Sequence, residues 1–112
     1  PLQLTFREEV EHEDIMIPPM LLIPMVENIF KHGVDKMQIC NEVHIYLHVN
    51  NKQLLFRVQN RVHEEKTDVN KKRGGIHNLR QRLKILYDND HELYVQQGGG
   101  YFTVQLKIPV EL

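Results

Sequence analysis

Alternation of apolar and polar residues constrains the fold of this chain more than any other feature. Apolar side chains occupy every second position from Val43 to Val49, and the segment "LLFRVQN" follows after a short asparagine-rich turn. A period of two is typical of half-buried strands, so this pair predicts a β-hairpin. "LQLTF" at residues 2–6 predicts a further strand. "HELYVQ" and "YFTVQLKI", joined through Gly98–Gly100, predict two more.

Two other segments have the spacing of helices. Pro18 and Pro19 favour a helix start, because proline costs least in the first turn. Pro24 removes a hydrogen bond inside a helix, so we expect an irregular first turn and regular helix from about Pro24 onward. A second, amphipathic helix over residues 76–87 is predicted by one apolar face, which comprises Ile76, Leu79, Leu83, Leu86 and Tyr87.

Length and composition indicate one globular domain of 112 residues, with 41% hydrophobic and 26% charged residues. The strand and helix patterns along it indicate that the domain mixes both. A formal charge of -1 argues against a general nucleic-acid or membrane-surface binder, which needs a net basic face. Cys40 is the only cysteine, so a reducing compartment is the simpler interpretation. No signal peptide is evident. Because the sequence begins "PLQLTF" without an initiator methionine, we expect it to be a piece of a longer protein.

The first helix carries a polar face that a core helix does not need. On a helical wheel Glu27, Asn28, Lys31 and His32 lie apart from the apolar face. One interpretation is a solvated surface with a Glu–Lys ion pair, contributing a few tenths of a kcal/mol. The other is a ligand site, because glutamate and asparagine supply oxygens that suit Mg²⁺ and lysine supplies charge for a phosphate.

A second candidate site lies before the second helix. Residues 60–75 are almost entirely polar and end in Gly74 and Gly75. This predicts a long loop, of which residues 61–73 form a lid. Glycines that lead into a helix expose backbone N–H groups able to bind an anion. Two glycines before a helix are more often a simple turn. Together with the polar helix face, however, they favour MgATP bound with its phosphates under a lid.

These motifs resemble those of a known family. "VENIFKHG" resembles the N-box of the GHKL ATPases, "IPPMLLIP" resembles the LytS-type sensor histidine kinases, and "GIHNLRQRLKILY" resembles a later motif of the same subfamily. The resemblance covers nearly the whole chain. It implies an α+β fold of the Bergerat type, a two-layer sandwich in which helices cover one face of a mixed β-sheet. It also implies that the chain is truncated at its N-terminal side relative to the family's domain.

The resemblance implies a role for each matching residue. Asn28 matches the Mg²⁺ ligand and Glu27 the acidic residue that polarises the attacking group. Lys31 and His32 match basic positions beside the phosphates. Gly74 and Gly75 match the segment at the start of the phosphate-binding helix, with Gly75 at its conserved glycine.

The expected activity is that of a protein-histidine kinase catalytic domain with ATP and Mg²⁺ as cofactors. The γ-phosphoryl group of ATP would be transferred to a histidine in a separate helical dimerisation domain of the same protein, and from there to a response regulator. The expected parent is a membrane-anchored homodimeric bacterial sensor of the inner membrane, with this domain in the cytoplasm. No nucleic-acid partner is expected.

Departures from the family pattern leave an alternative open. Asn60 stands where the family has an aspartate that accepts a hydrogen bond from adenine, although an amide can still accept and can also donate. Arg73 replaces the first glycine before the second helix, and the phosphoacceptor segment is absent from the sequence. The alternative is a degenerate module that keeps the fold and acts through protein contacts without catalysis.

Other residues carry weaker signals. His44 and His48 share a strand face but lie about 13 Å apart, too far for one metal ion. We interpret Cys40 as a packing residue. Arg82 is expected to be an ordinary surface residue, and the sequence leaves the role of Arg80 open.

Overall fold

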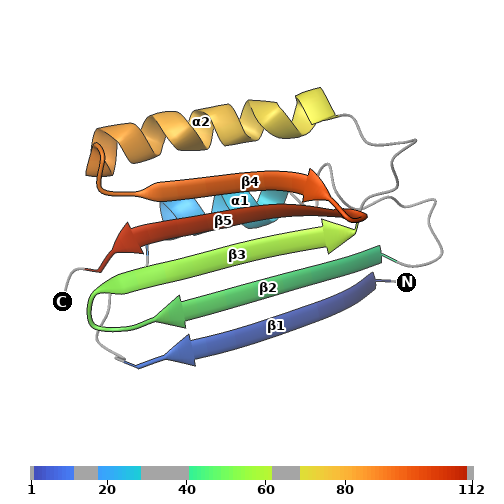
Figure 1. The fold of residues 1–112 in the computed structure, drawn as a ribbon, viewed down its shortest axis with the longest axis horizontal. Helices are drawn as coiled ribbons and strands as arrows, with labels where there is room; N and C mark the ends of the chain where they lie inside the picture. Colours follow the sequence, from blue (N-terminus) through green and yellow to red (C-terminus); the bar gives the residue numbers. More distant parts are fainter. Residues whose placement is uncertain (1, 12–17, 29–40, 62–68, 111–112) are drawn as a thin grey trace.

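The computed structural model describes residues 2–11, 18–28, 41–61 and 69–110. Five strands and two helices follow one another along this part of the chain (Figure 1). They are β1 (Leu2–Val10), α1 (Pro19–Asn28), β2 (Asn41–Val49), β3 (Gln53–Arg61), α2 (Val69–Tyr87), β4 (Glu92–Gly98) and β5 (Tyr101–Pro109).

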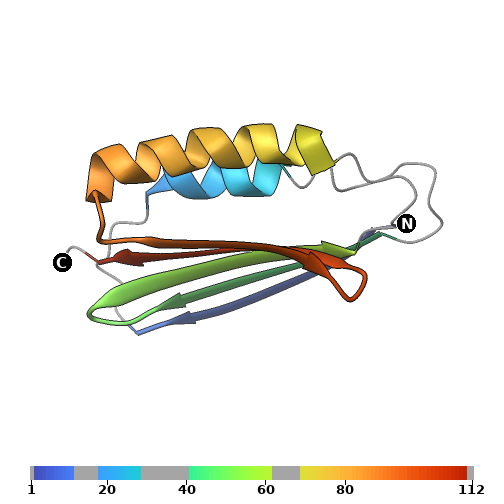
Figure 2. The ribbon, with the colours of Figure 1, turned by 45° about the horizontal axis from the view of Figure 1, so that its top comes forward.

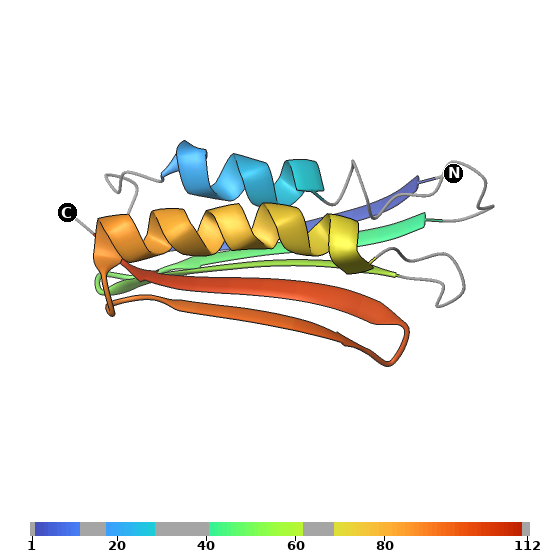
Figure 3. The same ribbon diagram turned by 90° about the horizontal axis from the view of Figure 1, so that it is seen from above.

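The strands form one mixed sheet in the order β1-β2-β3-β5-β4. β1 pairs with β2 in parallel, and the other three pairs are antiparallel. Parallel strands need a long crossover, and the chain between β1 and β2 includes α1. Both helices lie on the same face of the sheet, which leaves the other face without a helix in the described part of the chain (Figures 2 and 3). The predicted two-layer α+β fold is therefore confirmed.

Tight turns connect the antiparallel strands as the sequence predicts. Asn50 accepts hydrogen bonds through its side-chain oxygen from the backbone N–H groups of Lys52 (2.9 Å) and Gln53 (2.7 Å), which fixes the turn between β2 and β3. Gly99 and Gly100 link β4 to β5 with φ of 62° and 83°. A two-residue hairpin with both φ values positive matches the twist of the strands and requires residues such as glycine.

The core lies between the helices and the helix-facing side of the sheet. Alternate residues of β2, β3 and β5 supply most of it, together with one face of each helix. Its fully or nearly fully buried side chains are Leu21, Leu22, Met25, Val43, Ile45, Leu47, Val49, Leu54, Phe56, Val58, Ile76, Leu79, Leu83, Phe102, Val104, Leu106 and Ile108.

The edge strand β1 is longer than predicted, and some apolar side chains of β1 and of the last turn of α2 are more exposed than predicted. β1 extends to Val10 rather than ending at Phe6, and its Phe6 side chain is 55% exposed. In α2, Ile76, Leu79 and Leu83 are buried as predicted, whereas Leu86 is 61% exposed. A helical spacing predicts which residues share a face, but not how far the opposing layer extends beneath it.

Helix α1 starts earlier than predicted. It begins at Pro19, and the backbone N–H groups of Leu21 and Leu22 both donate to the carbonyl of Pro18, at 3.1 and 3.2 Å. The expectation of regular helix only from Pro24 was therefore wrong, because Pro19 sits in the first turn, where proline is well tolerated. Pro24 lies inside the helix.

A contact from the neighbouring helix compensates for Pro24. Proline has no N–H, so the carbonyl four residues earlier, that of Met20, loses its usual donor in the helix. Arg82 of α2 donates to this carbonyl through Nη1 at 3.1 Å. Arg82 is therefore more than an ordinary surface residue, because it supplies the donor that Pro24 removes.

Helix α2 also starts earlier than predicted, at Val69 instead of residue 76. The predicted lid over residues 61–73 is correspondingly wrong in its bounds, because Arg61 belongs to β3 and residues 69–73 are helical. Residues 62–68 lie outside the described part of the chain. A polar segment without an apolar stripe looks like a loop, yet extending an existing helix costs little once the packed turns have nucleated it.

Candidate functional site

Three elements end or begin together at one end of the molecule. The C-terminal end of α1, the N-terminal end of α2 and the last residues of β3 all lie at this end (Figures 1 and 3). Segments far apart in sequence thus bring Glu27, at the end of α1, to the same end of the molecule as Asn60 near the end of β3.

Asn60 is the only polar side chain that is buried among the described residues, at 1% exposure. Its register neighbours are Val43 and Phe102, both core residues on the helix-facing side of the sheet. Its Nδ2 donates to the carbonyl of Arg61 at 3.2 Å. A buried amide costs free energy unless it is hydrogen-bonded, and the contact with Arg61 supplies such a bond. At 1% exposure, a ligand can contact Asn60 only if neighbouring groups move.

The polar face predicted on α1 is described in part. Glu27 is exposed, as either interpretation of that face requires. Asn28 is the last residue of α1, and nothing is described of its side chain. Lys31 and His32 lie outside the described residues. Whether these four side chains form one site therefore stays a prediction.

The predicted helix-start anion site has a different geometry in the structure. Because α2 begins at Val69, Gly74 and Gly75 lie inside the helix instead of before it. Only the first four N–H groups of a helix lack a partner within it, so those of Gly74 and Gly75 are not free in this conformation. Glycine inside a helix is about 1 kcal/mol less favourable than alanine. The first turns of α2 are therefore the cheapest part of that helix to unwind.

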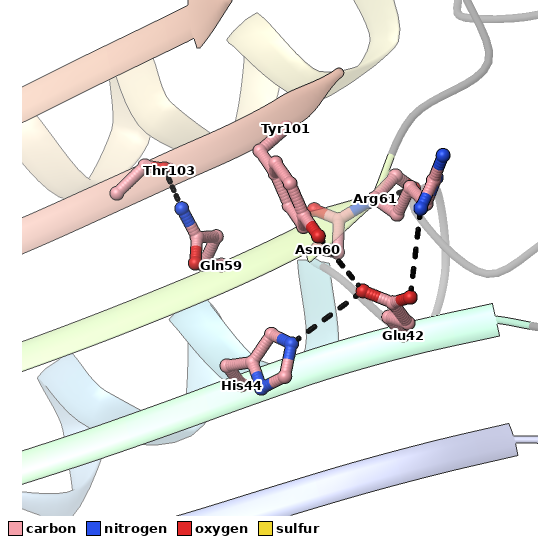
Figure 4. A network of polar contacts seen from close by, with 7 residues as sticks. All are labelled: Glu42, His44, Gln59, Asn60, Arg61, Tyr101 and Thr103. Carbon is pink, nitrogen blue, oxygen red and sulfur yellow. Dashed lines mark hydrogen bonds and ion pairs between the residues drawn. The ribbon is translucent and has the colours of Figure 1, made fainter. Parts of the chain in front are cut away.

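A polar network that the sequence interpretation missed lies on the opposite face of the sheet (Figure 4). Glu42 of β2 is its centre: it accepts a hydrogen bond from the Tyr101 hydroxyl at 2.9 Å and lies 3.6 Å from both Arg61 Nη1 and His44 Nε2. The hairpin register already implies the Glu42–Arg61 pair. Val43 pairs with Asn60, so Glu42, the residue before Val43, stands opposite Arg61, the residue after Asn60. The contact of Tyr101 with Glu42 could not be predicted without knowing the order of the strands in the sheet.

Hydrogen bonding shifts the ionisation of this network. The hydrogen bond from Tyr101, aided by His44 and the positive charge of Arg61 and opposed by partial burial, holds the pKa of Glu42 below its ordinary 4.5. The same hydrogen bond to the carboxylate raises the pKa of Tyr101 above 10.0. Glu42 is thus held as a carboxylate, and the network ties β2, β3 and β5 together at the end of the sheet where Asn60 lies.

Two further classes of site are not found in the described residues. No group of three or more histidine, cysteine, aspartate or glutamate side chains there is arranged to hold a metal ion. None of the described helices is both long enough and apolar enough to cross a bilayer.

Comparison with solved structures identifies the architecture. The catalytic domain of the histidine kinase ThkA, in a nucleotide-free form, superposes with a TM-score of 0.57 at 15% identity, covering 95% of this chain and 78% of that one. The blue-light-activated histidine kinase of Erythrobacter litoralis EL346 gives 0.59 at 19% identity, with 95% of this chain and 35% of that one. ThkA in complex with the response regulator TrrA gives 0.54 at 17% identity, with 95% and 34% covered.

The fold is that of histidine kinase catalytic domains. No protein-family model matches the sequence, and no curated protein matches it. At these identities the similarity establishes the fold alone, and the chain spans about a third of the length of two of the three kinases. In this histidine kinase fold, the end of the sheet that holds Asn60 is also where α1 ends with Glu27 and Asn28.

Proposed function

We propose that this chain is the ATP-binding catalytic domain of a two-component sensor histidine kinase of the LytS type. The observation that carries the proposal is Asn60, a buried amide on the helix-facing side of a histidine kinase fold, at the end of the molecule where α1 ends at Asn28 and exposes Glu27. The N-box resemblance and the histidine kinase fold both support this activity.

The proposed roles follow from the chemistry of each residue. Asn28 would ligate Mg²⁺, which supplies positive charge to the phosphates when bound, and Lys31 and His32 would add further positive charge there. Asn60 would contact the nucleotide base through its amide. Contact of the phosphates with the N–H groups of Gly74 and Gly75 would require the turn before them to unwind.

Glu27 has the chemical role. In the proposed reaction the bond between the γ-phosphorus and the bridging oxygen breaks, ADP leaves, and a new P–N bond forms to the acceptor imidazole. The attacking imidazole nitrogen must carry a free lone pair, so the ring proton sits on the other nitrogen. Glu27 orients the ring through that N–H or accepts its proton as the P–N bond forms. The histidine belongs to a separate helical domain, from which the phosphoryl group passes to a response regulator.

The alternative, a degenerate module that acts by protein contact, is supported by Asn60 itself. An amide replaces the expected carboxylate there, and it is 1% exposed. On this alternative the amide is a structural residue and no nucleotide reaches it.

Phosphoryl transfer from radiolabelled ATP to a histidine-bearing helical domain, supplied as a separate chain, tests the proposal. Glu27→Gln should lower the transfer rate by about 10²–10⁴, the usual contribution of a general base, while MgATP affinity stays within a few-fold. Glu92→Gln removes an exposed carboxylate on β4, 76% exposed, and serves as the matched control with an unchanged rate. Undiminished labelling by the Glu27→Gln variant would contradict the assignment of Glu27. No labelling by the parent protein would favour the degenerate module.

A further inference from the structure

The face of the sheet opposite the helices carries a hollow that the proposed function does not use. Residues of β1, β2 and β3 surround it, and its volume is about 430 Å³. This size falls within the roughly 300–1,000 Å³ that is typical of small-molecule sites. Apart from Ile45, whose side chain belongs to the core, the lining residues are Thr5, Arg7, His44, Tyr46, Arg57 and Gln59.

The strand register arranges these residues in two rows across the sheet. One row runs Arg7–Tyr46–Arg57, so an arginine stands on each side of one tyrosine. The neighbouring row runs Thr5–His44–Gln59 and adds a hydroxyl, an imidazole and a carboxamide. Neighbouring strands lie about 4.8 Å apart, so the two arginine backbones are separated by about 10 Å and their long side chains can converge above Tyr46.

Arg57 is held in an orientation that suits anion binding. Its guanidinium carbon lies 5.1 Å from the centre of the Tyr46 ring. A guanidinium stacked on an aromatic ring keeps the N–H groups along its edge free to form paired hydrogen bonds with an oxyanion. The ring of Tyr46 is itself stacked on that of His48, with centroids 6.4 Å apart and planes 15° apart, which limits its movement.

The charges of this face are unbalanced at the hollow. Arg61 lies 3.6 Å from Glu42, and Lys107 lies 3.9 Å from Glu92, so these two cations are paired. Across residues 2–11, 18–28, 41–61 and 69–110, no carboxylate comes within 4.0 Å of the guanidinium of Arg7 or Arg57.

The carboxylates nearest to the hollow along the strands stand in the adjacent rows. Glu42 stands beside His44 and is already bound by Tyr101 and Arg61. Glu9 stands beyond Arg7 on β1, opposite His48 in the register, and is exposed. Among the described residues, therefore, two guanidinium groups with no carboxylate partner and the polar side chains of Thr5, His44 and Gln59 line one hollow, and no acidic side chain lines it.

We propose that this hollow binds a small anion that carries more than one phosphate group. Each tetrahedral phosphate offers three oxygens to donors that approach from different sides, whereas a planar carboxylate offers two. Donors here come from three strands, with guanidinium groups on both sides and the side chains of Thr5, His44 and Gln59 along one edge. The site is on the opposite face of the sheet from Asn60, so it stands independently of the proposed kinase activity.

Titration of the isotope-labelled protein with sodium pyrophosphate, without Mg²⁺ and at low ionic strength, tests the proposal by NMR. Amide shifts should change on β1, β2 and β3 around the hollow, and each of Arg7→Gln and Arg57→Gln should weaken binding about tenfold, as expected for loss of a charge-assisted hydrogen bond. Arg57→Lys keeps the charge and loses the paired donors, so it should also weaken binding several-fold. Glu9→Gln should strengthen binding, because it removes an exposed negative charge from the row next to the hollow.

A matched control separates a specific site from general attraction. Lys107→Gln removes the same charge from the same face but on β5, away from the hollow, so it should change the affinity by less than about twofold. Equal weakening by Lys107→Gln, or parental affinity in the Arg7→Gln/Arg57→Gln double variant, would overturn the proposal. Binding of malonate as tight as that of pyrophosphate would overturn the assignment to phosphate.

Discussion

The hydrogen bond between Arg82 and the carbonyl of Met20 yields a prediction that the structure makes and the sequence does not. If the carbonyl needs Arg82 because Pro24 lacks an N–H, the effect of changing Arg82 must depend on residue 24. Arg82→Met keeps a long side chain and a similar helix propensity while removing the donor. Pro24→Ala restores a backbone donor within α1.

The magnitudes follow from the exposure of the contact. A hydrogen bond typically contributes about 0.5–1.5 kcal/mol, and this one is exposed, so water can partly replace Arg82 and the loss should be about 0.5–1 kcal/mol. Pro24→Ala should stabilise the protein by about 2 kcal/mol. A proline inside a helix destabilises it by about 3 kcal/mol, and its restriction of the unfolded chain offsets up to about 1 kcal/mol of this. In the background of the Pro24→Ala variant, Arg82→Met should cost close to nothing.

The double-mutant cycle is measured by urea denaturation followed by circular dichroism. The predicted coupling free energy is about 0.5–1 kcal/mol, within the range of residues in direct contact. Arg80→Met is the control, because Arg80 reaches towards Leu93 of β4 at 3.5 Å and not towards α1, so it should show no coupling to Pro24→Ala. If Arg82→Met costs the same in both backgrounds, Arg82 does not compensate for Pro24.

Two further predictions concern the end of the sheet that holds Asn60. Asn60→Asp buries a carboxylate at 1% exposure, so it should lower the free energy of unfolding of the free protein by several kcal/mol. It should also raise the ratio of ATP to GTP affinity, measured by calorimetry, and an unchanged ratio would mean that Asn60 does not face the base. Tyr101→Phe removes the hydrogen bond that lowers the pKa of Glu42 and raises the pKa of Tyr101. In the parent this contribution to stability is lost as pH falls below 4.5 through the lowered pKa of Glu42, and as pH rises above 10.0 through the raised pKa of Tyr101. The stability difference between parent and variant should therefore be largest between these limits. A difference independent of pH would show that the hydrogen bond is not its source.

Local pattern predicted much of the fold because it acts over a few residues. The alternation in β2, β3, β4 and β5 predicted those strands. In the structure the alternation of buried residues continues from Leu54 to Asn60, which puts Asn60 on the core side of β3. The faces of both helices were predicted on the same grounds. The bounds were predicted less well, because Val69 and Pro19 begin their helices through propagation and capping that apolar spacing does not reveal.

Contacts between distant segments could not be predicted. No local signal indicates that β5 lies between β3 and β4, so the contact of Tyr101 with Glu42 follows only from the strand order. Likewise, nothing in the sequence around Arg82 indicates that α1 lies beside it. The predicted roles of Asn28, Lys31 and His32 come from the sequence motif, because their side chains lie outside what the structure describes.

Thermal unfolding of the protein with ATP, in the presence and absence of Mg²⁺, tests the central claim most directly. A ligand at a hundred times its dissociation constant adds about 2.7 kcal/mol of stability, which for a domain of this size raises the melting temperature by roughly 10 °C. We expect a shift with millimolar MgATP that exceeds the shift with ATP alone, and we expect Asn28→Ala to remove that Mg²⁺-dependent part. No shift with millimolar MgATP would contradict the account and leave a histidine kinase fold that does not bind nucleotide.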